Sequence, residues 1–423
     1  MADFEFIDYF TDPAAADDNA GYCAQLRAIG PVVREPYHGA FMVTGYAAAV
    51  EVLAAKSGAF SSAVTVTGPI PPLPFAPEGD DIRAQLDRHR PDMPWTAHLA
   101  TFDGTHHAAH RALLAQLLTH SRLKKNADFV AGLVVNLTGN LIDRGGCEIT
   151  RDFAHALSTL VIADLLGIPE NDRDGLVQML GLPPTQLGGD EAAKVQADPL
   201  TWLHARFKEY LEDRIAAPQD DMLTGLVQSV YKDGSKPDID ELARLASFLF
   251  GAGQDTSARL VAFSFRVLGD RPDLQDRLRA QPELIPDFIE EVLRLEVPTK
   301  SISRLAVEPV TIGEVAIPAG AVVTVNLGGA NRDPAKFANP DRFELGRANG
   351  RDHLSFSRGA HGCIGAPLAR LEVRLALEQF LKCTSAIRIS PAHHGPPEAR
   401  RYAYEPTYLL SGLQALHVEW DRA

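Results

Sequence analysis

One cysteine has neighbours that suit a thiolate ligand. Cys363 lies in the segment FSRGAHGCIGAPLAR, residues 356–370, which is predicted to be a loop leading directly into a helix. A thiolate just before a helix start meets the positive end of the helix dipole and unpaired N–H groups, and both favour the anion. A single thiolate suits the axial position of a haem iron better than zinc, which needs more soft ligands nearby. The alternative is a buried, inert thiol.

Glycine and leucine residues around this cysteine define the expected shape of the segment. Glycines at positions 359, 362 and 365 permit tight turns and the close approach of a flat ligand. The following helix is expected to be amphipathic, with Leu368, Leu371 and Leu375 on one face. The sequence therefore predicts a thiolate loop followed by an amphipathic helix.

A long helix is predicted in the middle of the chain, from Asp238 to about Val267. Asp238 and Glu241 form a capping-box pattern, and Gly269 followed by Pro272 indicates the stop. Roughly thirty residues at a rise of about 1.5 Å make a rod of about 45 Å, enough to cross the whole domain. Such a helix should be central and largely buried.

The segment AGQDTS, residues 252–257, lies midway along this helix. Ala252 and Gly253 are small where a bound diatomic molecule would have to fit. The Thr256 hydroxyl can bond the Ala252 carbonyl, bend the helix and leave a notch. Taken alone, the segment is equally well a site of helix packing.

Two further patterns of polar residues have both a structural and a chemical interpretation. Glu291 and Arg294 are three apart on one helix face, where they can pair, although such a pair usually marks a solvated face. His106, His107 and His110 suggest a zinc site, since histidines at i and i+4 can share a metal. No acidic base lies between them and no third ligand is evident, which disfavours zinc hydrolysis.

Length and composition bound the class of protein. The 423 residues, 45% hydrophobic and 23% charged, contain no low-complexity linker, so one domain spanning 1–423 is expected. Helical patterning dominates, and β-like runs are short and occur mainly at about 305–330 and near the C-terminus. The net charge of −14 argues against nucleic acid or an anionic membrane as partner.

Other sequence features bear on location and on lids. The N-terminus has no secretory pattern, and no stretch of about 18 apolar residues occurs, so a membrane anchor is not expected. Four cysteines without a CxxC pair fit a reducing cytoplasm. Proline-rich residues 68–77 and the break at 181–190 predict loops that either pack on the surface or cover an apolar pocket. The open or closed state of the lid regions 63–100 and 181–190 is left undecided.

The segment around Cys363 resembles the haem-binding loop of the cytochrome P-450 superfamily, FxxGxHxCxGxxLAR, at every specified position. Other segments are similar to that family's motifs, occur in its order and extend the resemblance from about 100 to 420. These are DGTHHAAHR at 103–111, AGQDTS at 252–257, ExxR at 291–294, NRDP at 331–334 and PDRF at 340–343.

The resemblance implies a fold, a cofactor and a set of site residues. The fold is mainly α with small β-sheets, a triangular helix-rich domain with the long helix over the haem and a smaller β-rich region. Haem b would be held by Cys363 as axial ligand of the iron. The other cofactor contacts implied are His107, Arg111, Arg304 and His361 at the propionates, and Phe356, Gly365, Ala252 and Gly253 around the ring. Asp255 and Thr256 would relay protons to bound dioxygen, and Glu291, Arg294 and Arg342 would form a structural ion-pair network.

The resemblance further implies a soluble bacterial monooxygenase that inserts one atom of O₂ into a small to medium apolar molecule of terpenoid, aromatic or steroid-like type. Position alone places Met93, Trp95, Leu99, Phe248, Leu249, Ile302, Leu409 and Leu410 at the substrate. Because the chain has no flavin or iron–sulfur motif, electrons are expected from a ferredoxin and its NAD(P)H-dependent reductase, with Arg111 and Arg358 as contacts. A monomer is expected.

Three alternatives remain at this stage. The chain could be a peroxide-driven enzyme, a non-oxygenating haem-thiolate enzyme such as an isomerase or nitric-oxide reductase, or a haem-binding sensor or carrier without turnover. Peroxide-driven members commonly lack the acid–alcohol pair, and a carrier would not need one. The presence of both Asp255 and Thr256 therefore favours monooxygenation.

Overall fold

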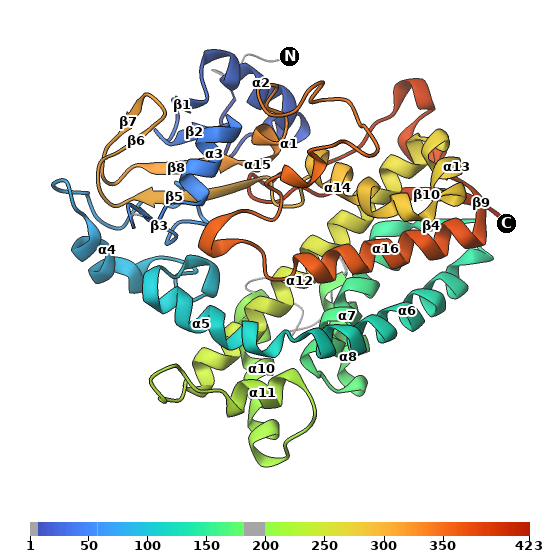
Figure 1. Cartoon of the computed structure of the whole chain (residues 1–423), viewed down its shortest axis with the longest axis horizontal. Helices are drawn as coiled ribbons and strands as arrows, with labels where there is room; N and C mark the ends of the chain where they lie inside the picture. The colour runs from blue at the N-terminus through green and yellow to red at the C-terminus, as the bar shows by residue number, and fades with distance from the viewer. Residues whose placement is uncertain (1–6, 57, 182–198) are drawn as a thin grey trace. The chain divides into compact units, whose positions relative to one another are not determined.

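The computed structural model describes residues 7–56, 58–181 and 199–423. The chain divides into two compact units (Figure 1). The sheet unit comprises Met1–Ala108, Glu290–Cys363 and Ala403–Gln414, and the helical unit comprises Ala109–Ile289, Ile364–Tyr402 and Ala415–Ala423. The single domain expected from the sequence stays a prediction. Beyond Gly181, the break expected at 181–190 lies outside the described residues.

A five-stranded sheet forms the core of the sheet unit, in the order β1-β2-β8-β5-β3. Neighbouring strands are antiparallel except β2 and β8, which are parallel. Its strands are β1 (Val32–Arg34), β2 (Phe41–Val43), β3 (Phe60–Ser61), β5 (Ser301–Ala306) and β8 (Val322–Asn326), and a separate hairpin joins β6 (Val310–Ile312) to β7 (Val315–Ile317). The sequence predicted the strands near 305–330 but missed β1, β2 and β3, which have only two or three residues each and show no alternation.

Short helices complete the sheet unit. They are α1 (Pro13–Asp17), α2 (Asn19–Ile29), α3 (Tyr46–Leu53), α4 (Arg83–His89) and α15 (Leu327–Ala330), with 3-10 turns η2 (Arg90–Asp92), η3 (Leu99–Thr101), η7 (Gly350–Asp352) and η8 (Gly359–His361). Ala49 of α3 packs against Val43 and Val325 in one apolar cluster. Residues 68–77 contain no helix or strand, as their prolines predicted.

Long helices make up most of the helical unit. They are α6 (His120–Ile142), α7 (Ala156–Leu166), α8 (Glu170–Gly181), α10 (Pro199–Ala216), α11 (Met222–Gln228), α12 (Ile239–Asp270), α13 (Pro272–Ala280), α16 (Ala366–Cys383) and α17 (Pro391–His394), with a π-helical turn η4 at Thr150–His155. Two helices cross the unit boundary, α5 (Gly104–Leu117) and α14 (Ile285–Leu295), and a small sheet contains β4 (Gly146–Glu148), β10 (His417–Arg422) and β9 (Thr384–Ile389) in that order. The prediction of a mainly α chain with small sheets is confirmed.

The long helix α12 begins as predicted. The Asp238 carboxylate accepts a hydrogen bond from the Glu241 amide at 2.7 Å, and the Glu241 carboxylate accepts one from the Asp238 amide at 3.0 Å. The helix ends at Asp270, between Gly269 and Pro272, where the sequence predicted the stop. Gly269 also has a second role. A Cβ there would lie 2.6 Å from Cδ1 of Ile389 on β9, so the glycine permits close packing of helix and strand.

The buried face of α16 differs from the expected one. Leu368 is buried, but Leu371 and Leu375 are only half-buried. The most buried positions are Leu368, Glu372, Val373, Ala376, Leu377, Phe380 and Leu381. The three leucines thus marked one edge of a broader buried side, and that side includes a glutamate.

Glu372 is fully buried between α7, α12 and α16. Its carboxyl group accepts hydrogen bonds from Ser158 Oγ at 3.0 Å and from Ser257 Oγ at 3.5 Å. Burial raises the pKa of Glu372 to about 8, although both serines lower it in part. The side chain is therefore protonated at neutral pH, because two hydroxyl groups do not replace the hydration of a carboxylate.

The predicted Glu291–Arg294 pair is present and buried. Arg294 is 0% exposed and binds the carboxylate in bidentate fashion, with Nε and Nη2 each 2.8 Å from a Glu291 oxygen. The third member is Arg347, whose Nε lies 3.0 Å from Glu291 Oε1. The prediction of Arg342 was wrong: its side chain is exposed, and only its carbonyl accepts from Arg294 and Arg347.

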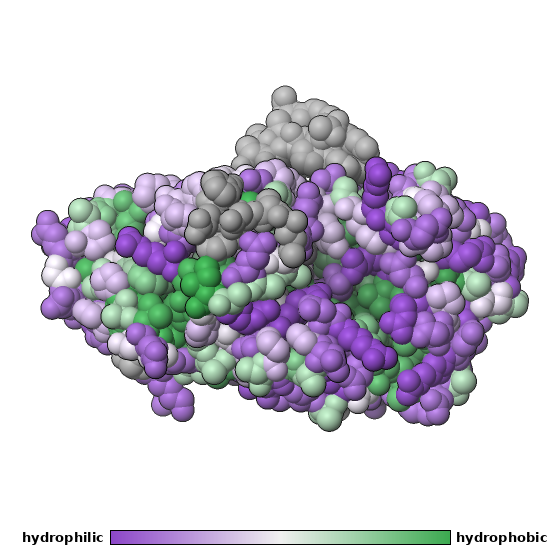
Figure 2. All heavy atoms as spheres, turned by 90° about the horizontal axis from the view of Figure 1, so that it is seen from above, coloured by the Kyte–Doolittle hydropathy of each residue, from purple (hydrophilic) through white to green (hydrophobic). Residues whose placement is uncertain are grey.

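The surface and the helices complete the description. On the face in Figure 2, hydrophilic and hydrophobic side chains are interspersed. Within the described residues, none of the helices combines the length and apolar character that a membrane span requires.

We predict that Arg294→Ala lowers the free energy of unfolding by about 3–5 kcal/mol, because it leaves the Glu291 carboxylate buried without its bidentate partner. Arg342→Ala is the matched control, since alanine keeps the accepting carbonyl, and its effect should stay within about 0.5 kcal/mol. Urea unfolding followed by circular dichroism measures both. Equal losses in the two variants would contradict the assignment of Arg347 in place of Arg342.

A second prediction concerns pH and Glu372. Because the folded pKa of about 8 exceeds the ordinary value of 4.5, the folded state binds the extra proton between these two values. The free energy of unfolding should therefore fall as pH rises through this window, by up to about 1.4 kcal/mol per pH unit. Glu372→Gln should remove this slope, whereas Glu378→Gln on the same helix should keep it. Parallel pH profiles of wild type and Glu372→Gln would show that the prediction is wrong.

Candidate functional site

The Cys363 loop belongs to the sheet unit and is held by its own backbone. The Cys363 amide donates to the Phe356 carbonyl at 2.8 Å, and the Gly362 amide donates to the Gly359 carbonyl at 3.1 Å. Gly359 has a φ of 73°, and a Cβ there would lie 2.4 Å from the Leu53 carbonyl oxygen. This glycine is needed for close packing on the end of α3, a reason that the sequence did not indicate.

Ser357 is an unexpected feature of this loop. Its φ is 58°, a left-handed backbone conformation that residues other than glycine rarely adopt. Its amide donates to the Leu354 carbonyl at 2.7 Å, and its hydroxyl is buried without a hydrogen-bond partner in the described part of the chain. No pattern in the sequence indicates this conformation.

Cys363 differs from the other cysteines in its exposure. Cys363 is exposed, whereas Cys23 is buried and Cys147 and Cys383 are partly buried. Burial raises the pKa of both Cys23 and Cys147 to about 12, which keeps them as thiols. Of the four, Cys363 is the exposed one.

Two histidines predicted to hold the propionates are in contact. The rings of His107 and His361 have centroids 3.9 Å apart, and His107 is buried. His361 Nε2 also lies 3.0 Å from Ser62 Oγ. Arg111 lies one helical turn after His107 on α5 and is half-buried.

Arg304 on β5 is a buried cation. Its Nη1 donates to Thr65 Oγ1 and to the Ser303 carbonyl, and it is 5% exposed. Burial lowers the pKa of Arg304 to about 10, against a raising effect of Asp103, so the side chain stays charged at neutral pH. No carboxylate forms an ion pair with Arg304 in the part of the chain that the structure describes. A buried cation of this kind is stabilised by an anionic ligand, and a haem propionate supplies one.

The oxygen-activation segment lies within α12 as expected. Thr256 Oγ1 donates to the Ala252 carbonyl at 2.8 Å, which confirms the predicted hydrogen bond, and Ala252 is exposed. The helix is continuous through these residues, so the predicted bend and notch stay predictions. A Cβ at Gly253 would lie 3.4 Å from Ile162, so this glycine packs against α7.

Asp255 has a partner that the sequence analysis missed. Arg259 Nε lies 2.9 Å from Asp255 Oδ2, one helical turn further along α12. Arg259 is 9% exposed, and the Asp255 side chain is half-buried. The i,i+4 spacing of acid and base was the available signal. The neighbouring Gln254 Nε2 lies 2.9 Å from His155 Nδ1.

The residues predicted to line the substrate pocket are divided between the units. In the sheet unit, Met93 and Leu99 are buried and Trp95 is 37% exposed with a φ of 66°. Half-buried members are Ile302, Leu409 and Leu410 in the sheet unit and Phe248 and Leu249 on α12. Their role at the substrate stays a prediction.

Two other sequence hypotheses concern individual contacts. Among the zinc candidates, His107 contacts His361, whereas His110 Nε2 lies 3.0 Å from the Tyr231 hydroxyl.

Arg358, a predicted contact for the ferredoxin, bonds within the protein. It donates from Nη2 to the Tyr46 hydroxyl at 3.2 Å and to the Asp352 carbonyl at 3.1 Å.

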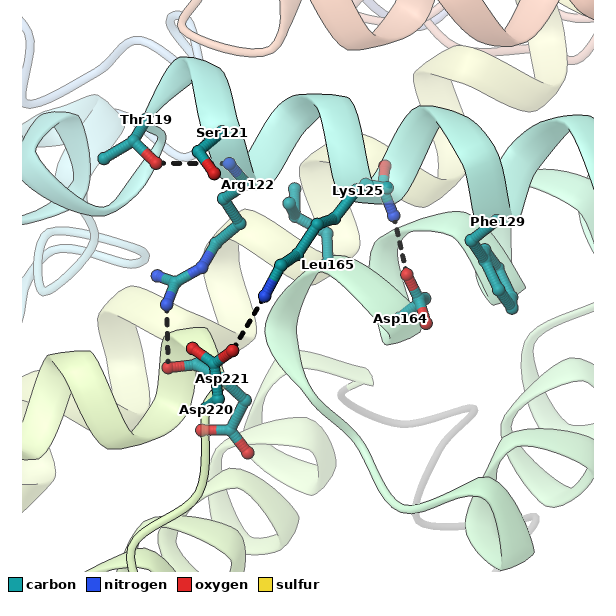
Figure 3. A pocket seen from close by; sticks show the side chains of 10 residues that line it. Thr119, Ser121, Arg122, Lys125, Phe129, Asp164, Leu165, Asp220 and Asp221 are labelled. Carbon is teal, nitrogen blue, oxygen red and sulfur yellow. Dashed lines mark hydrogen bonds and ion pairs between the residues drawn. The ribbon is translucent and has the colours of Figure 1, made fainter.

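A polar cavity of about 420 Å³ lies in the helical unit (Figure 3). Lys125 pairs with Asp220 at 2.8 Å across it, and Arg122 Nη2 donates to the Asp221 carbonyl at 3.3 Å. None of the residues predicted for haem or substrate lines it. Lining side chains of α6 bond to α7, from Asn126 to Asp164, and to the residues just before α11, from Lys125 to Asp220.

Comparisons with known proteins identify the family of this chain. The family described as cytochrome P450 matches residues 188–385. Cytochrome P450 144 of Mycobacterium tuberculosis is 33% identical over 368 residues, covering 86% of this chain and 82% of that protein. 6-Deoxyerythronolide B hydroxylase of Saccharopolyspora erythraea is 30% identical over 407 residues, covering 94% of this chain and 95% of that protein.

A solved structure extends the likeness to nearly every residue. Mycobacterium marinum cytochrome P450 CYP150A6 in its substrate-free form has 46% sequence identity and a TM-score of 0.93, covering 99% of this chain and 100% of that one. The exposed Cys363 and the buried Arg304 fit the axial and propionate positions of a haem. This chain belongs to the cytochrome P450 family, whose cofactor is haem b.

Proposed function

We propose that this protein is a monooxygenase that inserts one atom of O₂ into a small to medium apolar molecule. The observation that carries the proposal is the pairing of an exposed cysteine, in a loop fixed by backbone hydrogen bonds, with a buried arginine that has no carboxylate partner among the described residues. The cysteine suits the iron and the arginine suits a propionate. The relatives include a hydroxylase, which agrees with this activity.

The protein residues divide the work of holding the cofactor. Cys363 would ligate the iron, while His107, His361, Arg304 and Arg111 would bind the propionates. Haem, when bound, supplies the redox chemistry that activates dioxygen. Phe356, Gly365, Ala252 and Gly253 would lie against the ring. Ser62 orders His361 in advance and Thr65 orders Arg304, which reduces the entropy lost when the cofactor binds.

Thr256 and Asp255 would deliver protons. Thr256 Oγ1 donates a hydrogen bond to the Ala252 carbonyl at 2.8 Å, so the lone pairs of its oxygen are available to accept a hydrogen bond from an acid. Asp255 is held by Arg259 but keeps partial exposure, with 30% of its side chain accessible, and can exchange protons with solvent. Once the Asp255 carboxylate has taken up a proton from solvent, a shift away from Arg259 would carry that proton toward the Thr256 hydroxyl.

The substrate proposal rests on apolar side chains and on one relative. The predicted lining contains methionine, leucine, isoleucine, phenylalanine and tryptophan, which favour an apolar molecule. The relative from Saccharopolyspora erythraea acts, by its name, on 6-deoxyerythronolide B. We include terpenoid, aromatic and steroid-like molecules, as the sequence suggested. Electrons would come from a ferredoxin and its NAD(P)H-dependent reductase, with Arg111 and Arg358 near the docking face.

A peroxide-driven enzyme is the second candidate. It would use the same cysteine and propionate partners but would not need Asp255 and Thr256. The Thr256 hydrogen bond to Ala252 and the Asp255 pair with Arg259 both favour the oxygen-dependent reaction. Turnover with peroxide alone, as fast as with the full electron-transfer system, would favour the peroxide-driven enzyme.

We predict that Cys363→Ala abolishes the strongly red-shifted Soret band of the reduced carbon monoxide complex, because only a thiolate ligand produces it. Cys383→Ala, which removes a partly buried thiol on α16, should retain the band at wild-type intensity. Absorption difference spectra measure both. A red-shifted band that persists in Cys363→Ala would disprove the assigned ligand.

Thr256→Ala should lower product formed per NAD(P)H consumed and raise release of peroxide, since proton delivery is lost. A positioned acid contributes roughly a hundredfold or more to rate, so product formation should fall to that extent. Ser264→Ala is the control, because Ser264 makes the same hydrogen bond to the carbonyl four residues earlier, at 2.8 Å, further along α12. The assay uses any molecule that converts the haem from low to high spin. Unchanged coupling in Thr256→Ala would count against its role.

A further inference from the structure

Residues 90–101 form a self-contained loop in the sheet unit, between α4 and α5. Thr96 Oγ1 donates to the Arg90 carbonyl at 2.7 Å, and Thr101 Oγ1 donates to the His98 carbonyl at 2.7 Å. Thr101 is 0% exposed. The loop carries Met93, Trp95 and Leu99, which the sequence placed at the substrate. Its shape is therefore set by internal hydrogen bonds.

Arg90 closes the base of this loop. Its Nη1 donates to the Thr101 carbonyl at 2.8 Å, and its Nη2 lies 2.6 Å from Asp103 Oδ2. The guanidinium is planar and rigid, so one side chain fixes both ends of the loop in a defined geometry. The pair is only partly exposed, with 23% of the Arg90 side chain and 31% of the Asp103 side chain accessible. Solvent and salt screen such a pair less than a surface pair.

Asp103 continues the connection to the propionate side. Its Oδ2 accepts from Ser61 Oγ at 2.5 Å, and its Oδ1 accepts from the Ser62 amide at 2.7 Å. Ser62 is buried, and its Oγ lies 3.0 Å from His361 Nε2. A continuous chain of hydrogen bonds thus runs from the loop through Arg90, Asp103 and Ser62 to His361.

We propose that Arg90 and Asp103 are positioning residues that couple the 90–101 loop to His361. A ligand that presses on the loop then shifts the Arg90–Asp103 pair, and Ser62 transmits the shift to the histidine. The chain also works in reverse, because coupling between two sites is reciprocal. The inference rests on the proposed function, in which His361 binds a propionate and the loop lines the substrate pocket.

The test compares two azole probes whose nitrogen ligates the haem iron. Imidazole is small, whereas clotrimazole is bulky enough to contact a pocket wall. Arg90→Ala should weaken clotrimazole binding at least tenfold, because the loop must be ordered again on binding, and should change imidazole binding less than twofold. Arg90→Lys keeps the charge but has one nitrogen in place of the two that reach Thr101 and Asp103, so an intermediate loss is expected. Soret titrations give the dissociation constants.

A double-mutant cycle separates coupling from simple stabilisation. Ser62→Ala and Arg90→Ala are combined, and their effects on clotrimazole affinity should not multiply, because both interrupt the same chain. Arg88→Ala, an exposed neighbour on α4, is the matched control and should resemble wild type. If Arg90→Ala does not fold, Asp103→Asn replaces it in the cycle, since it keeps the size and loses the charge.

The outcomes separate the two proposals. Effects that multiply, or equal losses for imidazole and clotrimazole, would overturn the coupling while the thiolate spectrum is intact. Absence of the red-shifted carbon monoxide band in the wild type would instead disprove the proposed function. A shift of the haem reduction potential in Arg90→Ala, with none in Arg88→Ala, would support transmission as far as the cofactor, because stabilisation of the fold alone does not move the potential.

Discussion

The buried Arg294 guanidinium is the interaction on which the sheet unit depends. Its donors reach the Glu291 carboxylate and the carbonyls of Asn331, Pro340 and Arg342, so one side chain joins a helix to two separate loop segments. The Asn331 side chain accepts from the Leu354 amide at 2.7 Å. Leu354 begins the stretch that leads to the Cys363 loop. The buried Arg294 charge, which water does not reach, thus fixes the backbone segments that lead to the Cys363 loop. Each lost hydrogen bond would leave a buried polar group unsatisfied.

Much of the site could be predicted from the sequence because its motifs are local. The capping box at Asp238, the Thr256 hydrogen bond and the Glu291–Arg294 pair all join residues three or four apart on a helix, where spacing determines geometry. Arg347 was missed because it lies 56 residues after Glu291 in the sequence, and no periodic pattern relates residues so far apart. The packing role of Gly269 was missed for the same reason, since its contact is with a distant strand. The short strands β1, β2 and β3 form because they pair with neighbouring strands of the sheet, and their sequences show no alternation of hydrophobic and polar residues.

Two buried ionisable groups show how differently the two units treat charge. Glu372 is neutralised by a proton, so it adds no charge to the core of the helical unit at neutral pH. Arg304 remains a cation, although burial lowers its pKa to about 10, because guanidinium binds its proton far more tightly than a carboxylate does. The neutral Glu372 can pack within the core. The charged Arg304 can form an ion pair with an anion that binds beside it.

The left-handed Ser357 has a consequence for how the cofactor is acquired. This backbone conformation costs a residue with a Cβ roughly 1–2 kcal/mol relative to the right-handed form, and the position is occupied by serine and not by glycine. The loop adopts it because the amides of Ser357 and Cys363 are both satisfied by neighbouring carbonyls. The protein's own contacts therefore shape the ligand loop. Haem would therefore meet a Cys363 loop that is already ordered, which reduces the entropy lost when the cofactor binds.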